Sequence, residues 1–214
     1  MTDQYSVNWE LDSLYPHPET AEFRVAIDQI KSELSQLADL SETLPPVSTT
    51  AETVDMWAAF LNRHAAAHAE FSAINAFVGC HAAADAANKT FQQYEGELSA
   101  LSPLRSQVTT NIEFSFQAAD DKTFATFVSS AGSLEENVYF LQLCRRNASL
   151  RLPKDQELLA AALDVDGLHA WGRVYDRLSG ELRIQIQHRG EIIDRSPGQV
   201  QFDMPERALR ENNF

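Results

Sequence analysis

The chain has 214 residues, of which 31 are acidic and 17 are basic, so its formal net charge is −14. This charge argues against a protein that binds duplex nucleic acid or an anionic membrane surface, because both partners require a basic face. With 44% hydrophobic residues, 8 glycines and 8 prolines, the composition is typical of a globular protein of one or two domains.

The N-terminus and the two cysteines indicate the cellular compartment of the protein. The first ten residues are polar and lack the basic start and apolar run of a signal peptide. No apolar stretch is long enough to span a bilayer. Cys80 and Cys144 lie far apart and form no Cys-x-x-Cys pair, so we expect two reduced, buried thiols. The sequence therefore predicts a cytoplasmic protein.

Hydrophobic periodicity predicts a mainly α-helical fold built on long helices. Pro18 is expected to open the first helix, and Pro45-Pro46 to end it. A second helix runs from the Ser48–Thr50 cap to Ala87 and a third from about Thr90 towards Ala118, folding back as an antiparallel hairpin, with Pro103 as a site for a kink. The residues expected on the apolar faces are Phe23, Ile27, Ile30, Leu34 and Leu37, then Val54, Trp57, Leu61, His68, Phe71, Ile74 and Val78, then Phe91, Tyr94, Leu98, Leu101, Leu104, Val108 and Ile112.

Shorter elements follow the long helices. New helices are expected at Asp120, Gly132-Ser133, Pro153 and Asp166-Gly167. After Gly180 the period changes to two, which predicts a small β-hairpin over residues 182–194. A hairpin alone is marginally stable, so it must pack on helices or on something absent from this chain. A helix then begins at Met204 and has only two turns before Phe214. We divide the chain at 1–147 and 148–214, two regions of one continuous structural unit.

The pair His64 and His68 is the strongest candidate for a metal site. Histidines four residues apart share one face of a helix, as in the zinc motif His-Glu-x-x-His. Ala65, however, replaces the glutamate that would act as general base, and His81 is about 20 Å further along a straight helix. The sequence therefore predicts no metal ligand and no catalytic residue, and substrate-binding residues cannot be named from it.

The acidic motifs also have a structural explanation. Asp164-Val165-Asp166-Gly167 resembles the start of a calcium loop but lacks further oxygen ligands, so we expect Asp166 to cap a helix. Glu95 with Glu97, Asp120-Asp121 and Glu135-Glu136 are expected on solvated helix surfaces. No Gly-x-Ser-x-Gly, Gly-x-Gly-x-x-Gly or phosphate-binding loop is present in the sequence.

Two stretches resemble the oligoendopeptidase F family. Residues 9–16, Trp-Glu-Leu-Asp-Ser-Leu-Tyr-Pro, resemble the Trp-Asp-Leu-x-x-Leu-Tyr opening of that family. Residues 167–182 resemble its Trp-x-x-Leu-Tyr-Asp-x-Leu segment, which precedes a β-hairpin. The order of the expected elements also agrees along the chain.

The resemblance implies a mainly helical zinc metallopeptidase that cleaves short peptides in a deep channel. In the family a His-Glu-x-x-His and a later glutamate hold the zinc in the C-terminal half, and the 214 residues contain no such motif. The resemblance thus implies the N-terminal, channel-forming region of such an enzyme, inactive alone, with no cofactor of its own and with the C-terminal catalytic half as partner. A free-standing acidic adaptor domain and, more weakly, a metal-binding helical protein using His64 and His68 remain alternatives.

Overall fold

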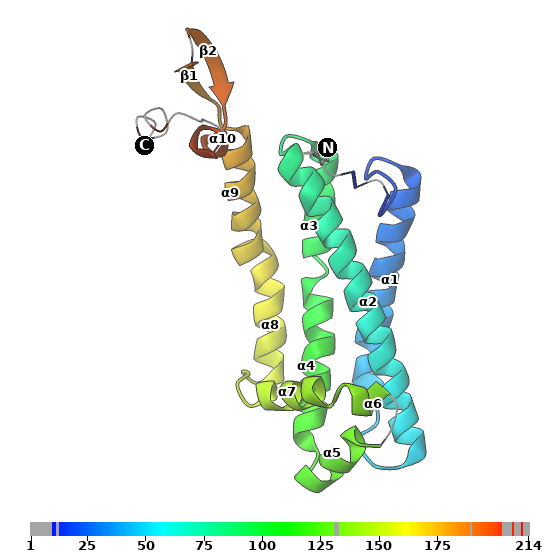
Figure 1. The fold of residues 1–214 in the computed structure, drawn as a ribbon. Coiled ribbons are helices and arrows are strands. Elements are labelled where there is room, and N and C mark those ends of the chain that lie inside the picture. The colour runs from blue at the N-terminus through cyan, green and yellow to red at the C-terminus, as the bar shows by residue number, and fades with distance from the viewer. Residues whose placement is uncertain are drawn as a thin grey trace, which may run out of the picture.

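The computed structural model describes residues 10–11, 13–130, 133–188, 190–202, 207 and 211. The elements, in chain order, are α1 (Ala21–Thr43), α2 (Ala51–Ala84), α3 (Lys89–Ser99), α4 (Ser102–Ala118), α5 (Asp121–Val128), α6 (Ser133–Glu136), α7 (Val138–Ala148), α8 (Lys154–Asp164), the π-helical turn η1 (Val165–His169), α9 (Ala170–Glu181), β1 (Ile184–His188), β2 (Glu191–Arg195) and α10 (Pro197–Phe202). The long helices stand side by side, α5 to α7 gather at one end of them, and the β-hairpin lies at the other end (Figure 1). The predicted fold class, mainly α with one small hairpin near the C-terminus, is confirmed.

Helix α1 shows how the sequence sets a helix and its buried face. Its N-cap is Thr20, whose hydroxyl accepts the N–H of Phe23, so Pro18 lies in the preceding turn and not in the helix. All five apolar residues predicted for its inner face are buried. They face aromatic residues of α2 and α4, among them Trp57, whose indole N–H donates to the carbonyl of Pro45 at 3.0 Å.

The predicted start of α2 is confirmed, but its buried face differs from the predicted one. Thr50 caps it as expected, but the helix ends at Ala84, three residues before the predicted end. Phe60 and Phe77, which the predicted face omitted, are buried, and His68, which it included, is exposed. The long helix contacts neighbours on more than one side, so its buried surface is wider than one stripe.

The predicted third helix is two helices, α3 and α4, and the expectation of one continuous helix was wrong. Asn88 caps α3 by accepting the N–H groups of Thr90 and Phe91. The helix ends at Ser99, and Pro103 lies in the first turn of α4, where its missing N–H is tolerated. Pro103 has no N–H to donate to the Ser99 carbonyl. One helix therefore ends and a new helix begins where the sequence predicted a kink.

Helices α8 and α9 form one column that the π turn η1 joins (Figure 1). The prediction that Asp166 caps a separate helix was wrong, because Asp166 lies inside η1. No residue of α8, η1 or α9 is fully buried. Helix α8 packs along α4, and α9 lies beside α2 and α3.

An apolar stripe runs along the exposed side of this column. Its members recur every three or four residues, except for one step of five between Leu163 and Leu168. That step falls across η1, where a π turn takes up one residue more than an α turn and keeps Leu168 in line with Leu163. The apolar stripe consists of Leu159, Leu163, Leu168, Trp171, Tyr175 and Leu178, all of them exposed.

The β-hairpin forms as predicted and packs on a helix, one of the two alternatives that the sequence left open. β1 and β2 pair antiparallel, with Ile186 opposite Ile193, and Gly190 takes the positive φ of 89° that the tight turn needs. Ile186 is buried against Val200 of α10, a short helix that the sequence analysis missed. Of the helix predicted from Met204, the described residues Arg207 and Glu211 are helical and form an ion pair at 2.6 Å; the remainder lies outside the described residues, as does Trp9. Among the residues described, no helix has the length and apolar character needed to cross a membrane.

Candidate functional site

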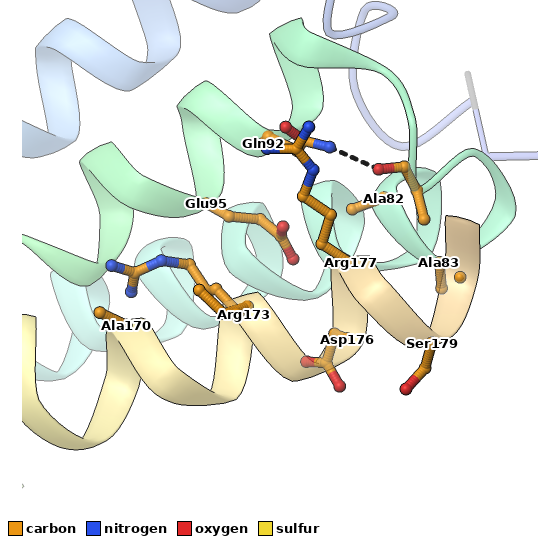
Figure 2. Close-up of a pocket in the computed structure, with 13 residues that line it drawn as sticks. Ala82, Ala83, Gln92, Glu95, Ala170, Arg173, Asp176, Arg177 and Ser179 are labelled. Atoms are coloured by element: carbon orange, nitrogen blue, oxygen red, sulfur yellow. Dashed lines mark hydrogen bonds between the residues drawn. The ribbon is translucent and has the colours of Figure 1, made fainter. Parts of the chain in front are cut away.

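A groove lies between α9 and the helices α2 and α3. Two hollows of about 540 Å³ each share Gly79, Glu95, Arg173 and Asp176 in their walls, so they form one continuous groove. Figure 2 shows α9 lying along α2 and α3, with the Glu95 carboxylate directed into the space between them and Arg177 extending from α9 towards α3.

Small residues allow the helices to approach closely at one end of this groove. A Cβ atom at Gly180 of α9 would lie only 2.5 Å from the Cβ of Ala86, just beyond the end of α2. Gln92 of α3 donates to the Ala86 carbonyl at 2.5 Å and holds this turn in place (Figure 2). Gly79, Ala82 and Ala83 line the α2 wall, where their short side chains leave room for the hollow.

Four charged residues line the second hollow without any ion pair to a described residue within 4.0 Å. They are Glu95, Arg105, Arg173 and Asp176. Burial, followed by repulsion from Asp176, raises the pKa of Glu95, although Arg173 opposes the shift. Arg173 donates to the hydroxyl of Ser99 at 2.7 Å, which fixes its guanidinium at the wall.

Arg105 is partly buried at the α4 end of the groove. Its guanidinium lies over the ring of Phe71, 4.2 Å from the centroid, and reaches the Nδ1 atom of His68 at 3.5 Å. Burial lowers the pKa of Arg105, but a guanidinium stays charged in proteins. The site therefore holds a fixed positive charge against an aromatic wall.

The expectation that Glu95 and Glu97 are both solvated surface residues was wrong. Glu97 bonds to Arg24 at 2.9 Å and also to Lys31, so it ties α3 to α1. Burial alone would raise the pKa of Glu97, but the hydrogen bonds from Lys31, Arg24 and Gln93 lower it to about 2. Residues two apart on a helix face different directions, so one glutamate faces α1 and the other lines the groove. Only the packing of three helices reveals this division.

His64 and His68 lie on neighbouring turns of α2, as predicted, with ring centroids 6.3 Å apart. The His64 ring stacks on Phe60, and its Nδ1 atom is buried with no hydrogen-bond partner among the described residues. Burial, together with the charges of His68 and Arg105, lowers the pKa of His64 to about 4, so the ring is neutral at pH 7.

The surroundings of this pair do not fit a zinc site. Among the described residues no three of His, Cys, Asp and Glu come together as a ligand set. The His68 ring instead faces the cationic Arg105, and a zinc ion would be repelled there. His81 packs between Phe77 and Phe91, away from His64 and His68. A hollow of about 290 Å³ beside His64 has mainly apolar walls, including Leu134 and Leu141.

The two cysteines differ in exposure, so the expectation of two buried thiols holds for one of them. Cys144 is buried under α4, and burial and the charge of Glu113 raise its pKa to about 11. Cys80 is exposed on α2. Neither forms a disulfide among the described residues.

Comparison with known proteins agrees with the resemblance seen in the sequence. Residues 116–184 match the model of a family described as Oligopeptidase F. The fold is similar to that in the crystal structure of oligoendopeptidase-F from Enterococcus faecium, with a TM-score of 0.66 and 21% sequence identity. No curated protein sequence gives a significant match.

The extent of each match decides what it establishes. The structural match covers 87% of this chain but 37% of the Enterococcus faecium chain, so the chain spans little more than a third of that protein. The family match runs from the end of α4 to the start of β1 and includes the whole apolar stripe. The two findings confirm the resemblance to the N-terminal region of the oligopeptidase F family, a family of peptidases.

Proposed function

We propose that this chain is the N-terminal, channel-forming region of an oligoendopeptidase F-like zinc metallopeptidase that cleaves short peptides. The zinc and the catalytic residues belong to a C-terminal half, and this region supplies a wall of the substrate channel. The absence of His-Glu-x-x-His from the 214 residues and the unsuitable surroundings of His64 and His68 support an inactive role for the chain alone. The cytoplasmic location is proposed from the sequence.

The observation that carries this proposal is the apolar stripe. Trp171 is 73% exposed and Tyr175 71% exposed, on a column where no residue is fully buried. Monomeric soluble proteins rarely leave a continuous apolar surface of this length in water. The stripe lies within the segment that matches the family model, and the solved relative is longer than this chain. A covering partner from the same polypeptide, the C-terminal half, accounts for all three observations.

The test compares two proteins with one assay. The 214-residue chain and the product of the complete reading frame are incubated with a quenched fluorescent peptide, with and without a chelator. We expect chelator-sensitive hydrolysis from the longer protein and none from the 214-residue chain. Hydrolysis by the short chain that disappears in a His64→Ala/His68→Ala variant would refute the proposal and favour a metal site on α2. An inactive longer protein without His-Glu-x-x-His would favour the adaptor alternative.

A further inference from the structure

The groove between α2, α3 and α9 contains opposite charges that form no ion pair within 4.0 Å among the described residues. Acidic residues outnumber basic ones by 31 to 17, so an arginine has many possible carboxylate partners. Arg24, Arg63 and Arg151 each bind a carboxylate within the described chain. Arg105 and Arg173 line the groove and have no such partner within 4.0 Å among the described residues. Arg146, Arg183 and Arg195 also have no such partner among the described residues, but they do not line this groove. Arg105 and Arg173 differ because both are partly buried in one hollow, and this pair of guanidinium groups favours an anionic group from outside.

The chemistry of Arg105 favours a carboxylate as that group. The Arg105 guanidinium lies over the Phe71 ring, 4.2 Å from its centroid, and no carboxylate of the described residues pairs with it. A planar guanidinium with parallel N–H donors matches a carboxylate in two hydrogen bonds. Arg173, fixed by Ser99, adds a second positive charge to the same hollow.

The carboxylates of the groove favour an ammonium group on the same ligand. Glu95 accepts no hydrogen bond from a described side chain, and its carboxylate points into the groove (Figure 2). Asp176 lies close enough to repel it. A cation placed between these carboxylates would relieve the repulsion, and an ammonium brings three donors.

We propose that this groove binds a short peptide with free termini, its carboxylate at Arg105 and its ammonium at Glu95. The second hollow alone, about 540 Å³, falls within the roughly 300–1,000 Å³ that small-molecule sites occupy. This deepens the proposed function, because a short peptide is also the substrate class proposed there. Binding is measured without hydrolysis, so failure of the one proposal is distinguishable from failure of the other.

The test uses ligand variants, so that it does not depend on any altered protein folding correctly. Tri-alanine, its N-acetylated form and its C-terminal amide are titrated into the 214-residue chain by isothermal titration calorimetry. We expect saturable 1:1 binding of tri-alanine, and a loss of about tenfold or more for each capped peptide, the size expected when a charged hydrogen bond is removed. Equal affinity for all three peptides, or no saturable binding of tri-alanine at about 10 mM, would overturn the proposal.

Two protein variants then assign the termini to their partners. Glu95→Gln should weaken tri-alanine about tenfold and leave the acetylated peptide unchanged, because only the free ammonium needs the charge of Glu95. Arg105→Gln should weaken the binding of tri-alanine about tenfold and leave the binding of its C-terminal amide unchanged, because only the free carboxylate needs the charge of Arg105. Arg146→Gln, on the exposed side of α7, is the matched control and should bind all three peptides as the original chain does. If Glu95→Gln weakens the acetylated and free peptides equally, the assigned orientation is wrong.

Discussion

Arg151, in the connection between α7 and α8, donates from its guanidinium to the buried carboxylate of Glu113 on α4. The Glu113 side chain is only 3% exposed, and that of Arg151 is 27% exposed. Arg151 also bonds to Glu157 at 3.0 Å, and Glu157 accepts the N–H of Leu152 at 2.9 Å. These contacts fix the start of α8 on α4, and α8 in turn sets the direction of the column that carries the apolar stripe.

Removing Arg151 should therefore destabilise the fold more than removing a surface charge. Arg151→Met leaves the Glu113 carboxylate buried without a partner, and we expect a loss of about 3 kcal/mol in the free energy of unfolding, measured by urea denaturation. Arg151→Met combined with Glu113→Leu should recover part of the loss, because the unpaired charge is gone. A single variant as stable as the original would show that the ion pair does not anchor α8.

Gly180 should be sensitive to a single methyl group. A Cβ there would meet the Ala86 Cβ at 2.5 Å, so Gly180→Ala must push α9 away from the end of α2. We expect a loss of about 1–3 kcal/mol, as for other overpacked contacts, measured by thermal or urea unfolding. Gly172→Ala, on the same helix with nothing within 4 Å of its Cβ, is the control and should be neutral or gain up to about 1 kcal/mol in helix propensity. Equal effects of the two substitutions would contradict the close approach.

His64 should make the stability depend on pH. Its pKa is about 4 in the folded chain, against an ordinary value of 6.5, so between these values the unfolded chain takes up a proton that the folded chain does not. Stability is therefore fully present above pH 6.5 and falls as the pH drops towards 4, by roughly 3 kcal/mol in total.

The variant His64→Leu isolates this contribution. It removes the titrating ring, so the slope of unfolding free energy against pH between 6.5 and 4 should become shallower than in the original chain. His169→Leu, at an exposed histidine of η1, is the matched variant against which the change in slope is compared. An unchanged slope in His64→Leu would mean that other groups carry the acid sensitivity.

The apolar stripe should drive self-association of the 214-residue chain when no partner covers it. Replacing Trp171 and Tyr175 together by serine removes two large exposed side chains and should lower the association seen by light scattering, with little effect on stability, because neither residue is buried. Tyr139→Ser, an equally exposed aromatic on α7, should leave association unchanged. If light scattering shows only monomer across a wide concentration range, the apolar stripe does not drive self-association.

Local signals in the sequence determined most of the elements. The three- and four-residue steps from Phe23 to Leu37 predicted a helix with one buried face, and the alternation after Gly180 predicted the hairpin, because each signal lies within a few residues of chain. The Gly167–Leu182 motif pointed to the oligoendopeptidase F family, and residues 116–184 match that family's model. The break before Pro103 lay within reach of the same reasoning, since a proline removes the preceding hydrogen bond.

Tertiary structure alone decided what the charged and polar residues do. Glu95 and Glu97 look alike in sequence, but packing against α1 pairs Glu97 with Arg24, while α9 covers Glu95 without pairing it. The five-residue step between Leu163 and Leu168 departs from the spacing of an α-helix, but the π turn η1 accommodates the extra residue. Periodicity reports which residues share a face, but the partner of a side chain is set by segments far away in the chain. Burial and pairing therefore depend on helix packing, which no local pattern encodes.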